Sequence, residues 1–177
     1  MKPPIHIRPF AAGDAPAFHE AARESSPEVF PWLPWCRPDY SGIEAQQWVD
    51  SRQKLFEEGR EFCFVIADAE DRFLGCIDIS QVHATHRMAN VGYWVRSSEA
   101  GQGIIPQAIR MVADFAFRRT ILVRLEILCD VENVRSQRAA EKAGAVREGV
   151  LRHRLFVHDQ PHDAVMYSVL RSDWNGV

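Results

Sequence analysis

The chain has 177 residues, a usual length for one domain and enough to bury a hydrophobic core. Hydrophobic residues make up 46% of the sequence and charged residues 25%, and the net charge is −3. This composition is that of a globular protein, and it gives no electrostatic case for a nucleic-acid partner. We therefore expect a single domain over residues 1–177 with no direct contact to nucleic acid.

The cysteines and the N-terminus bear on the cellular compartment. The four cysteines are scattered, mostly within apolar runs, and form no CxxC pair: Cys36, Cys63, Cys76 and Cys129. This pattern favours buried, reduced thiols over disulfides or a zinc site. Residues 1–4 lack the apolar run of a signal peptide, and no stretch approaches the roughly 18 apolar residues that span a bilayer. We expect a cytoplasmic protein that does not contact membranes.

The first third of the chain predicts a strand, two helices and an aromatic loop. A strand is expected at residues 5–8, and a helix at residues 14–24, where Asp14 is a favoured cap type. Residues 27–38 contain four prolines and two tryptophans. Because proline removes backbone donors, this segment is predicted to form neither a regular helix nor a central strand. Ser41 and Glu44 fit a capping box, which starts a helix ending near residue 59.

The remaining residues alternate between strand and helix patterns. We predict strands at 62–67, 72–80, 89–95, 122–128, 145–151 and 164–170, and helices at 104–118 and 134–143. Gly144 directly follows the last helix, where glycine is common. The order β-α-α-β-β-β-α-β-α-β-β predicts an α/β (α+β) fold, with helices packed on a mixed sheet.

The segment Gly101-Gln102-Gly103, here called the glycine loop, joins a predicted strand to a predicted helix. Glycine permits close approach of a ligand to the backbone, and a helix start offers unpaired N–H groups and a partial positive charge. These features suit a pyrophosphate. A simple tight turn is the alternative. The loop matches neither the GxGxxG fingerprint nor the P-loop, the commonest rival phosphate sites.

A second motif lies after the strand predicted at residues 122–128. Asn133 follows that strand, begins a helix and is followed by Ser136. An asparagine at this point is a good helix cap, and Ser136 is then an ordinary serine of the first turn. The motif carries chemistry only if these side chains also face a ligand.

The order and spacing of these pieces resemble the GNAT acetyltransferases. Within that superfamily they resemble the RimJ/RimL branch, which includes ribosomal-protein N-terminal acetyltransferases. The resemblance rests on the strand, the glycine loop and its helix, followed by a strand, Asn-x-x-Ser and a helix that ends in Lys-Ala-Gly. Further matching segments extend it over nearly the whole chain: Trp32-Leu33-Pro34-Trp35, Gly92-Tyr93-Trp94, Glu148-Gly149-Val150-Leu151-Arg152, His162-Asp163 with Tyr167, and Leu170-Arg171-Ser172-Asp173-Trp174.

This resemblance implies a mixed, mostly antiparallel sheet that opens into a V between the strands ending at Val95 and Leu128, with acetyl-CoA in the V. Backbone groups near Val95 and Arg96 would hold the pantetheine arm and the acetyl carbonyl. Asn133 would bind the pantetheine or a water, and Ser136 would lie near the thiol. The N–H groups implied for the pyrophosphate are those of Ala100, Gly101, Gln102, Gly103, Ile104 and Ile105.

Two positions depart from the family pattern. Ser98 stands where the loop of the superfamily usually has Gln or Arg, which removes one side-chain contact and leaves the backbone donors. Ala140 stands where many GNAT enzymes have the tyrosine that reprotonates the thiolate. Ser136 or a water would then act as the acid. The missing tyrosine also leaves open a non-catalytic acyl-CoA-binding module as the alternative function.

The general base cannot be identified from the sequence. Glu61, Asp78, His83 and His86 lie on or beside the central strands, and they qualify by position alone. Two histidine pairs occur, His83 with His86 and His158 with His162. A metal site is not expected, because neither pair has an obvious third ligand.

The acceptor side is suggested by the aromatic loop. Trp32 and Trp35 either form part of the acceptor pocket or cap the core. Arg135 and Arg138 either meet the phosphates of CoA or are ordinary surface arginines. The predicted activity is acetyl transfer from acetyl-CoA to an amine, either a protein N-terminus or a small molecule. Added strands and an apolar loop are compatible with a homodimer.

Overall fold

The computed structural model describes residues 3–176. Its helices and strands follow the predicted order. They are β1 (Ile5–Pro9), α1 (Ala15–Val29), α2 (Gly42–Glu57), β2 (Phe62–Asp68), β3 (Phe73–His83), β4 (Met88–Val95), α3 (Ile104–Arg119), β5 (Arg124–Asp130), α4 (Val134–Ala143), β6 (Val146–Val157) and β7 (Gln160–Leu170). In this part of the chain, no helix is both long enough and apolar enough to cross a membrane.

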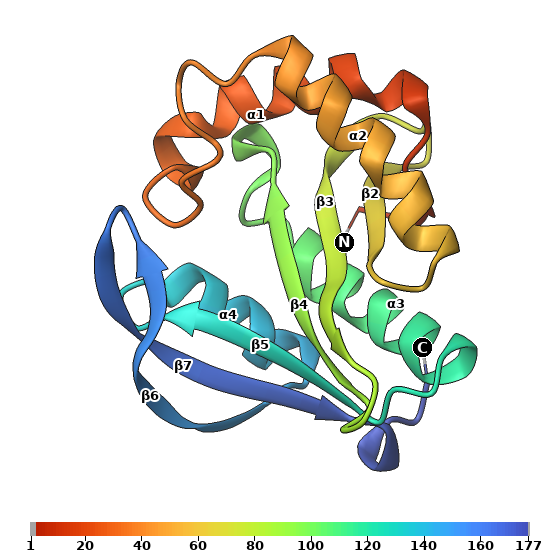
Figure 1. The fold of residues 1–177 in the computed structure, drawn as a ribbon, viewed down its shortest axis with the longest axis vertical. Coiled ribbons are helices and arrows are strands. Elements are labelled where there is room, and N and C mark those ends of the chain that lie inside the picture. The colour runs from red at the N-terminus through yellow and green to blue at the C-terminus, as the bar shows by residue number, and fades with distance from the viewer. Residues whose placement is uncertain (1–2, 177) are drawn as a thin grey trace.

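The strands form one sheet in the order β1-β2-β3-β4-β5-β7-β6 (Figure 1). Strands β4 and β5 are parallel, and the other neighbouring pairs are antiparallel. The mixed, mostly antiparallel sheet is therefore confirmed. The parallel pair is joined through α3, as a parallel connection requires.

Strands β4 and β5 stay together over a short distance and then separate. Their paired residues run only from Met88–Arg124 to Asn90–Glu126. Beyond these residues the two strands diverge, and Figure 1 shows them as the arms of a V. Backbone groups on the facing edges are consequently left without a neighbouring strand. Such groups need another partner when they are buried, and a ligand can supply it.

Helices cover both faces of the sheet. Alternate residues of β2 enter two different clusters, with Phe64 and Ile66 beside α3 and with Cys63 and Val65 beside α1 and α2. Because these strands are buried on both sides, they have continuous apolar runs instead of a strict alternation. The part of the sheet formed by β2, β3 and β4 is thus packed on both faces, and the V opens between β4 and β5, inside the sheet.

The predicted start of α2 is confirmed in detail. The Ser41 hydroxyl accepts from the Glu44 N–H at 3.3 Å, and the Ser41 N–H donates to the Glu44 carboxylate at 3.0 Å. Arg37 and Ser41 lower the pKa of the Glu44 carboxyl to about 2. The capping box fixes where the chain turns from the aromatic loop into the helix.

Helix α1 extends further than predicted, through Pro27 to Val29. The expectation that residues 27–38 contain no regular helix is wrong for its first three residues. Proline loses only one hydrogen bond near a helix end, and the last turns of α1 make tertiary contacts that offset it. The Ser25 hydroxyl accepts from the Ser97 N–H at 3.0 Å, and the Glu24 carboxylate accepts from the Ser98 N–H at 3.0 Å.

The last two strands are also longer than predicted, and β5 begins and ends two residues later. Strands β6 and β7 pair out to Val157 and Gln160 across a turn at His158 and Asp159. Both turn residues have left-handed φ values, 49° and 59°, as short hairpin turns require. Residues 152–154 and 160–163 of this hairpin are polar apart from Pro161, and none of them is buried. This part of the sequence therefore lacks the apolar alternation that marks a strand, although Val157 near the tip is buried. Mutual pairing, rather than burial, extends it.

Candidate active site

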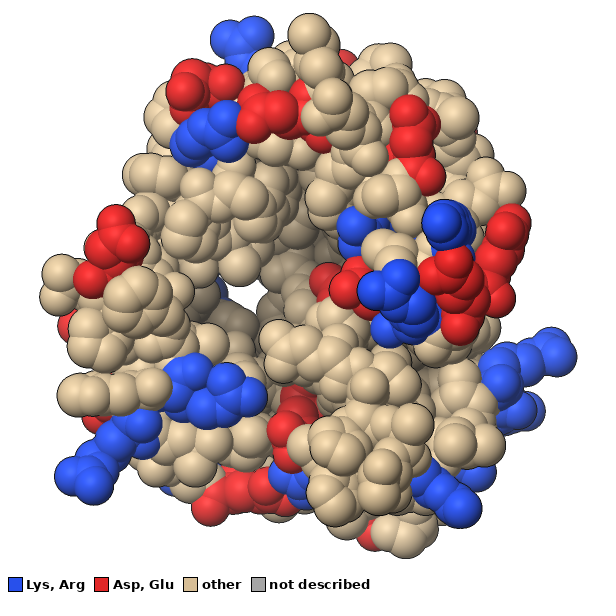
Figure 2. All heavy atoms as spheres, in the orientation of Figure 1, with Lys and Arg blue, Asp and Glu red and all other residues tan. Residues whose placement is uncertain are grey.

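A cavity of about 580 Å³ fills the space between the arms of the V. Its walls come from β4, the glycine loop, the start of α3, β5, α4, the loop between α1 and α2, and β6. Figure 2 shows an opening that passes through the molecule at this place. A site open on two sides can admit two different molecules from opposite directions.

The glycine loop forms one end of the cavity. Gly101 and Gly103 both line it, with left-handed φ values of 84° and 77°. Gly103 is the N-cap residue of α3. Within residues 3–176, the N–H groups of Gly101, Gln102 and Gly103 have no hydrogen-bond acceptor, and the first turn of α3 adds further free donors. Free N–H groups at the positive end of a helix make an anion site.

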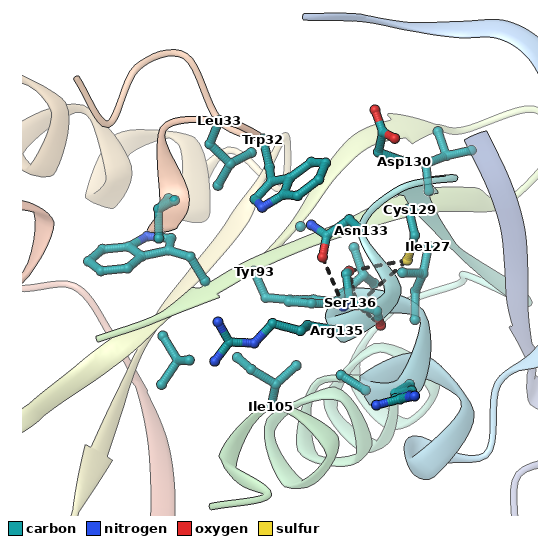
Figure 3. Close-up of a pocket in the computed structure, with 18 of the residues that line it drawn as sticks. Trp32, Leu33, Tyr93, Ile105, Ile127, Cys129, Asp130, Asn133, Arg135 and Ser136 are labelled. Atoms are coloured by element: carbon teal, nitrogen blue, oxygen red, sulfur yellow. Dashed lines mark hydrogen bonds between the residues drawn. The ribbon is translucent and has the colours of Figure 1, made fainter. Parts of the chain in front are cut away.

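Basic side chains flank this end of the cavity. Arg135, Arg138 and Lys142 of α4 line it. None of the three has an acidic partner in the described part of the chain. In Figure 3 the Arg135 side chain extends across the cavity towards Ile105 at the start of α3. Their charges complement a ligand that carries several phosphates.

The edge of β4 presents backbone groups to the same space. Successive residues of a strand direct their N–H groups to opposite edges. The Arg96 N–H donates to Leu74 O of β3 at 2.7 Å, so the N–H of Val95 points to the V. Val95 lines the cavity. Its position suits a donor to a carbonyl oxygen placed there.

Arg96 does not fit the predicted role. Its N–H is bonded to β3, and its carbonyl accepts from the Glu99 N–H at 2.9 Å. The side chain is buried and forms ion pairs with Glu20 and Glu24 of α1. Arg96 thus joins α1 to the end of β4, and no backbone group of this residue is free for a ligand.

The middle of the cavity contains a small polar cluster below the diverging strands (Figure 3). The Ser136 hydroxyl lies 3.0 Å from the Tyr93 hydroxyl and 3.2 Å from Cys129 Sγ. The Asn133 side chain accepts from the Ser136 N–H at 3.1 Å. The helix-cap interpretation of Asn133 is thereby confirmed, and both Asn133 and Ser136 also line the cavity. Capping and ligand contact are compatible at this position.

Tyr93 and Cys129 were not singled out from the sequence. Burial raises the pKa of both groups, so both remain protonated at neutral pH. The strand alternation of β4 puts Tyr93 on the face of α4, but only the fold shows that its hydroxyl meets Ser136. A tyrosine eight residues before the glycine loop and a cysteine seven residues before the serine were the available signals.

Most, but not all, of the predicted site residues line the cavity. The cavity is lined by Val95, Ala100, Gly101, Gly103, Ile104, Ile105, Asn133, Ser136 and Trp32. Gln102 does not line it, and its side chain donates to Glu99 at 2.8 Å. Its contribution would be limited to the main-chain N–H.

The two tryptophans of the aromatic loop lie in different surroundings. Trp32 lies on the cavity wall beside Leu33 (Figure 3). Trp35 does not line the cavity. Its ring stacks on Phe18 at 5.7 Å and meets Tyr40 at 5.4 Å. These are the contacts of a core residue, and they favour the packing role for Trp35 over the acceptor role.

The aromatic loop and the β6–β7 hairpin meet over the cavity. The His158 ring hydrogen-bonds to Phe30 O at 2.9 Å, and the two rings are 4.5 Å apart. In Figure 1 the hairpin tip lies beside the loop that follows α1. This contact closes the outer side of the V and leaves the passage seen in Figure 2.

Of the four residues that qualified as bases by position, Asp78 packs against a residue of the cavity wall. Its carboxylate occupies the space that a Cβ on Gly92 would fill, 2.9 Å from that position, and Gly92 lines the cavity. Burial raises the pKa of Asp78 to about 6. Glu61 is instead paired with Arg52 at 2.7 Å.

The remaining two, the histidines at 83 and 86, stack on each other at an exposed turn between β3 and β4. No group of three or more His, Cys, Asp or Glu residues between positions 3 and 176 is arranged to hold a metal ion.

Comparison with known proteins agrees with this geometry. Residues 5–146 match the family model described as "Acetyltransferase (GNAT) domain". The YdaF protein of Bacillus subtilis is 35% identical over 102 residues, which are 58% of this chain and 56% of YdaF. The alignment thus spans about half of that relative.

Two longer matches extend the likeness. The ribosomal-protein-serine acetyltransferase of Escherichia coli is 29% identical over 77% of this chain and 75% of its own. The structure of Mycobacterium smegmatis RimJ in complex with CoA-disulfide superposes with a TM-score of 0.88 at 26% identity, over 97% of this chain and 84% of RimJ.

The family model covers most of the chain, and the relatives resemble the RimJ/RimL branch expected from the motifs. The cavity lies where β4 and β5 diverge, and the glycine loop and the start of α3 line it. The chain therefore belongs to the GNAT family of acetyltransferases and is an N-acetyltransferase with acetyl-CoA as its co-substrate.

Proposed function

We propose that this enzyme transfers the acetyl group of acetyl-CoA directly to an amine, either a protein N-terminus or a small-molecule amine. The observation that carries the proposal is the two-sided cavity, with free N–H donors at one end and the Ser136 hydroxyl at its centre. Acetyl-CoA enters from the side of the glycine loop. The amine enters from the opposite side and meets the thioester between the arms of the V.

The cofactor is held mainly by the backbone. The N–H groups from Gly101 to Ile105 bind the pyrophosphate, whereas the predicted donor Ala100 gives its N–H to Ser97 O at 3.2 Å. The basic residues of α4 neutralise the phosphates. The Val95 N–H donates to the acetyl carbonyl, where negative charge develops in the transition state. Asn133 contacts the pantetheine arm and orients the first turn of α4.

The chemical step is attack by a neutral amine on the thioester carbon. The fixed position of both reactants supplies much of the rate. When the C–S bond breaks, the Ser136 hydroxyl gives its proton to the departing thiolate and regains the proton that the attacking nitrogen loses as the amide forms. Tyr93 and Cys129 hold this hydroxyl within the cavity, so Ser136 occupies the role of the tyrosine that Ala140 replaces.

A protein N-terminus fits the acceptor side well. The relatives include an enzyme named as a ribosomal-protein-serine acetyltransferase. The passage through the molecule leaves room for an extended chain end. Trp32 offers a broad apolar wall and a π face that attracts a cationic amine. Small amines reach the same point without using the outer part of the passage.

Mass spectrometry after incubation with acetyl-CoA tests the proposal. The acceptor panel contains serine- and alanine-initiated hexapeptides, spermidine and simple alkylamines. A product one acetyl group heavier, at the N-terminus or a primary amine, is expected with release of free CoA thiol. CoA binding demonstrated by calorimetry, without acetylation of any member of the panel, would contradict transfer to these amine classes.

A further inference from the structure

Three carboxylate side chains line the cavity, and two of them bond to neighbouring side chains at one end of it. Glu28 accepts a hydrogen bond from the Ser97 hydroxyl at 2.7 Å, and Glu99 is paired with Arg72 at 2.8 Å. Both belong to the end of the cavity near the glycine loop. The third, Asp130, has no arginine or lysine partner within residues 3–176. Its partners are a backbone N–H and an imidazole, so no fixed arginine or lysine of the described residues competes there with an incoming ammonium ion.

Asp130 lies on the acceptor side of the cavity, where the amine is proposed to enter. It ends β5 directly after Cys129, and successive strand residues point to opposite faces. Its side chain therefore lies away from the cluster of Cys129 and Ser136, and Figure 3 shows its carboxylate on the side of Trp32. Asp130 is only 5% exposed. A buried carboxylate without a cation is costly, unless hydrogen bonds or a bound cation compensate.

Each oxygen of Asp130 has a different partner. Oδ1 accepts from the Glu132 N–H at 2.8 Å, which fixes the carboxylate relative to the start of α4. Oδ2 lies 2.6 Å from Nδ1 of His162 on β7. Asp130 pairs with Ala164, two residues from His162, so both side chains share one face of the sheet.

His162 connects this buried carboxylate to solvent. Its side chain is 31% exposed, against 5% for Asp130. An imidazole exchanges protons readily near neutral pH. A buried carboxylate bonded to a half-exposed imidazole provides a route for a proton from the cavity to water. Most amines need such a route, because they arrive as ammonium ions without a lone pair.

We propose that Asp130 is the proton acceptor for the incoming amine and that His162 passes the proton to solvent. This inference rests on the acetyl transfer proposed above. The Asp130 carboxylate takes one proton from the ammonium nitrogen, and the free amine then attacks the thioester. His162, as the Nε2–H tautomer, takes up the proton at Nδ1 and releases one to water from Nε2, and proton exchange of the imidazole with water then restores the starting tautomer. Overall, ammonium and acetyl-CoA give amide, CoA thiol and one proton.

The test compares nucleophiles that differ in their need for a base. A serine-initiated hexapeptide or a primary alkylamine is protonated at neutral pH, whereas an aminooxy counterpart of the same size is not. Asp130→Asn should lower kcat/KM for the ammonium acceptor by about 10²–10³-fold, the usual contribution of a general base. The loss with the aminooxy acceptor should be much smaller. His162→Gln should show the same selectivity with a smaller loss, as expected of a residue that acts on the amine only through Asp130.

Glu132→Gln is the matched control, because it removes a neighbouring exposed carboxylate and should leave both acceptors unaffected. Calorimetry should give an unchanged Kd for acetyl-CoA in all three variants. Equal losses with both acceptors, or no loss in Asp130→Asn, would overturn the relay while leaving acetyl transfer intact. If the Asp130 variant does not fold, an unselective effect of His162→Gln overturns it equally. Failure of the wild-type enzyme to acetylate any amine would instead overturn the proposed function together with the relay.

Discussion

The two sides of the cavity are built in different ways. On the cofactor side, the binding groups are mostly backbone N–H groups from one continuous strand, loop and helix, residues 88–119. On the acceptor side, the wall is assembled from side chains distant in the sequence. Phe30 meets His158, 128 residues away, and Asp130 meets His162, 32 residues away.

This difference has consequences for how the two sides tolerate change. Backbone donors depend on the local conformation, so many side chains can be replaced without loss of the anion site. A wall made from distant side chains changes with any one of them. We therefore expect cofactor binding to be sensitive to backbone conformation, and acceptor recognition to be sensitive to single side chains on the aromatic loop and the hairpin.

Apart from the loss predicted above for Asp130→Asn, the largest effect is expected at Ser136, where the cofactor side and the acceptor side meet. Ser136→Ala removes the proton donor to the thiolate and should lower kcat by about 10²-fold, the lower range for general acid catalysis. The Kd for acetyl-CoA and the Tm should change little. Steady-state kinetics with detection of CoA thiol measures this. Tyr93→Phe keeps the ring and should have a weaker effect in the same direction. An unchanged kcat in Ser136→Ala would assign the acid role to water.

Substitutions at two matched glycines test whether cofactor binding depends on the backbone conformation of the glycine loop. Gly101 and Gly144 both have left-handed φ, 84° and 95°, and a Cβ at either would meet no protein atom within 4 Å. Gly101→Val should raise the Kd for CoA by about 10- to 100-fold, since it disturbs charge-assisted hydrogen bonds worth about 1.5–3 kcal/mol. Gly144→Val carries similar backbone strain away from the cavity.

Calorimetry and melting curves on both glycine variants separate strain from lost binding. Both should lower the Tm, and only Gly101→Val should weaken CoA binding. An equal rise of Kd in the two variants would show that the free N–H groups of the loop are not the anion site.

On the acceptor side, substitutions of Trp32 and Trp35 provide a second comparison of this kind. Trp32→Ala should raise the KM for the amine by about 2- to 30-fold, through loss of a cation–π contact of about 0.5–2 kcal/mol. The Kd for acetyl-CoA should not change. Trp35→Ala should instead lower the free energy of unfolding by about 3 kcal/mol, because its ring packs on Phe18 and Tyr40. A KM effect confined to Trp35→Ala would reverse this assignment.

The smallest effect concerns Asp78, whose carboxylate packs against Gly92 of the cavity wall. Its folded-state pKa of about 6 lies above the ordinary aspartate value, so the folded protein binds more protons than the unfolded protein between about pH 4 and pH 6. The free energy of unfolding therefore falls as the pH rises through this window. Asp78→Asn should remove that fall and gain on the order of 1–3 kcal/mol above pH 6.

Denaturant titrations of Asp78→Asn and wild type at pH 4 and pH 8 check this sign. The two proteins should differ little at pH 4 and most at pH 8. A larger difference at pH 4 would show that the Asp78 carboxylate is stabilised, not penalised, by its surroundings.

The sequence alone determined the order of the elements, the glycine loop and the cap of α4. These features depend on short-range chemistry: proline and glycine positions, capping side chains and the apolar period of each element. The same local signals predicted a tight turn at the glycine loop, because glycine readily adopts the left-handed φ values found at Gly101 and Gly103. The helix end at Val29 escaped prediction because contacts with residues 97 and 98 offset the cost of Pro27.

Only the tertiary structure decided which side chains share the cavity. Trp32 and Trp35 are equivalent in the sequence, yet packing against Phe18 removes Trp35 from the wall. Arg96 is next to Val95, yet its N–H is bonded to β3 while that of Val95 points to the V. Tyr93 meets Ser136, and Asp130 meets His162, only because the parallel pairing of β4 and β5 stops at Asn90 and brings α4 and β7 beside the open strands. Strand pairing and side-chain packing over long separations fix these contacts, and no local pattern encodes them.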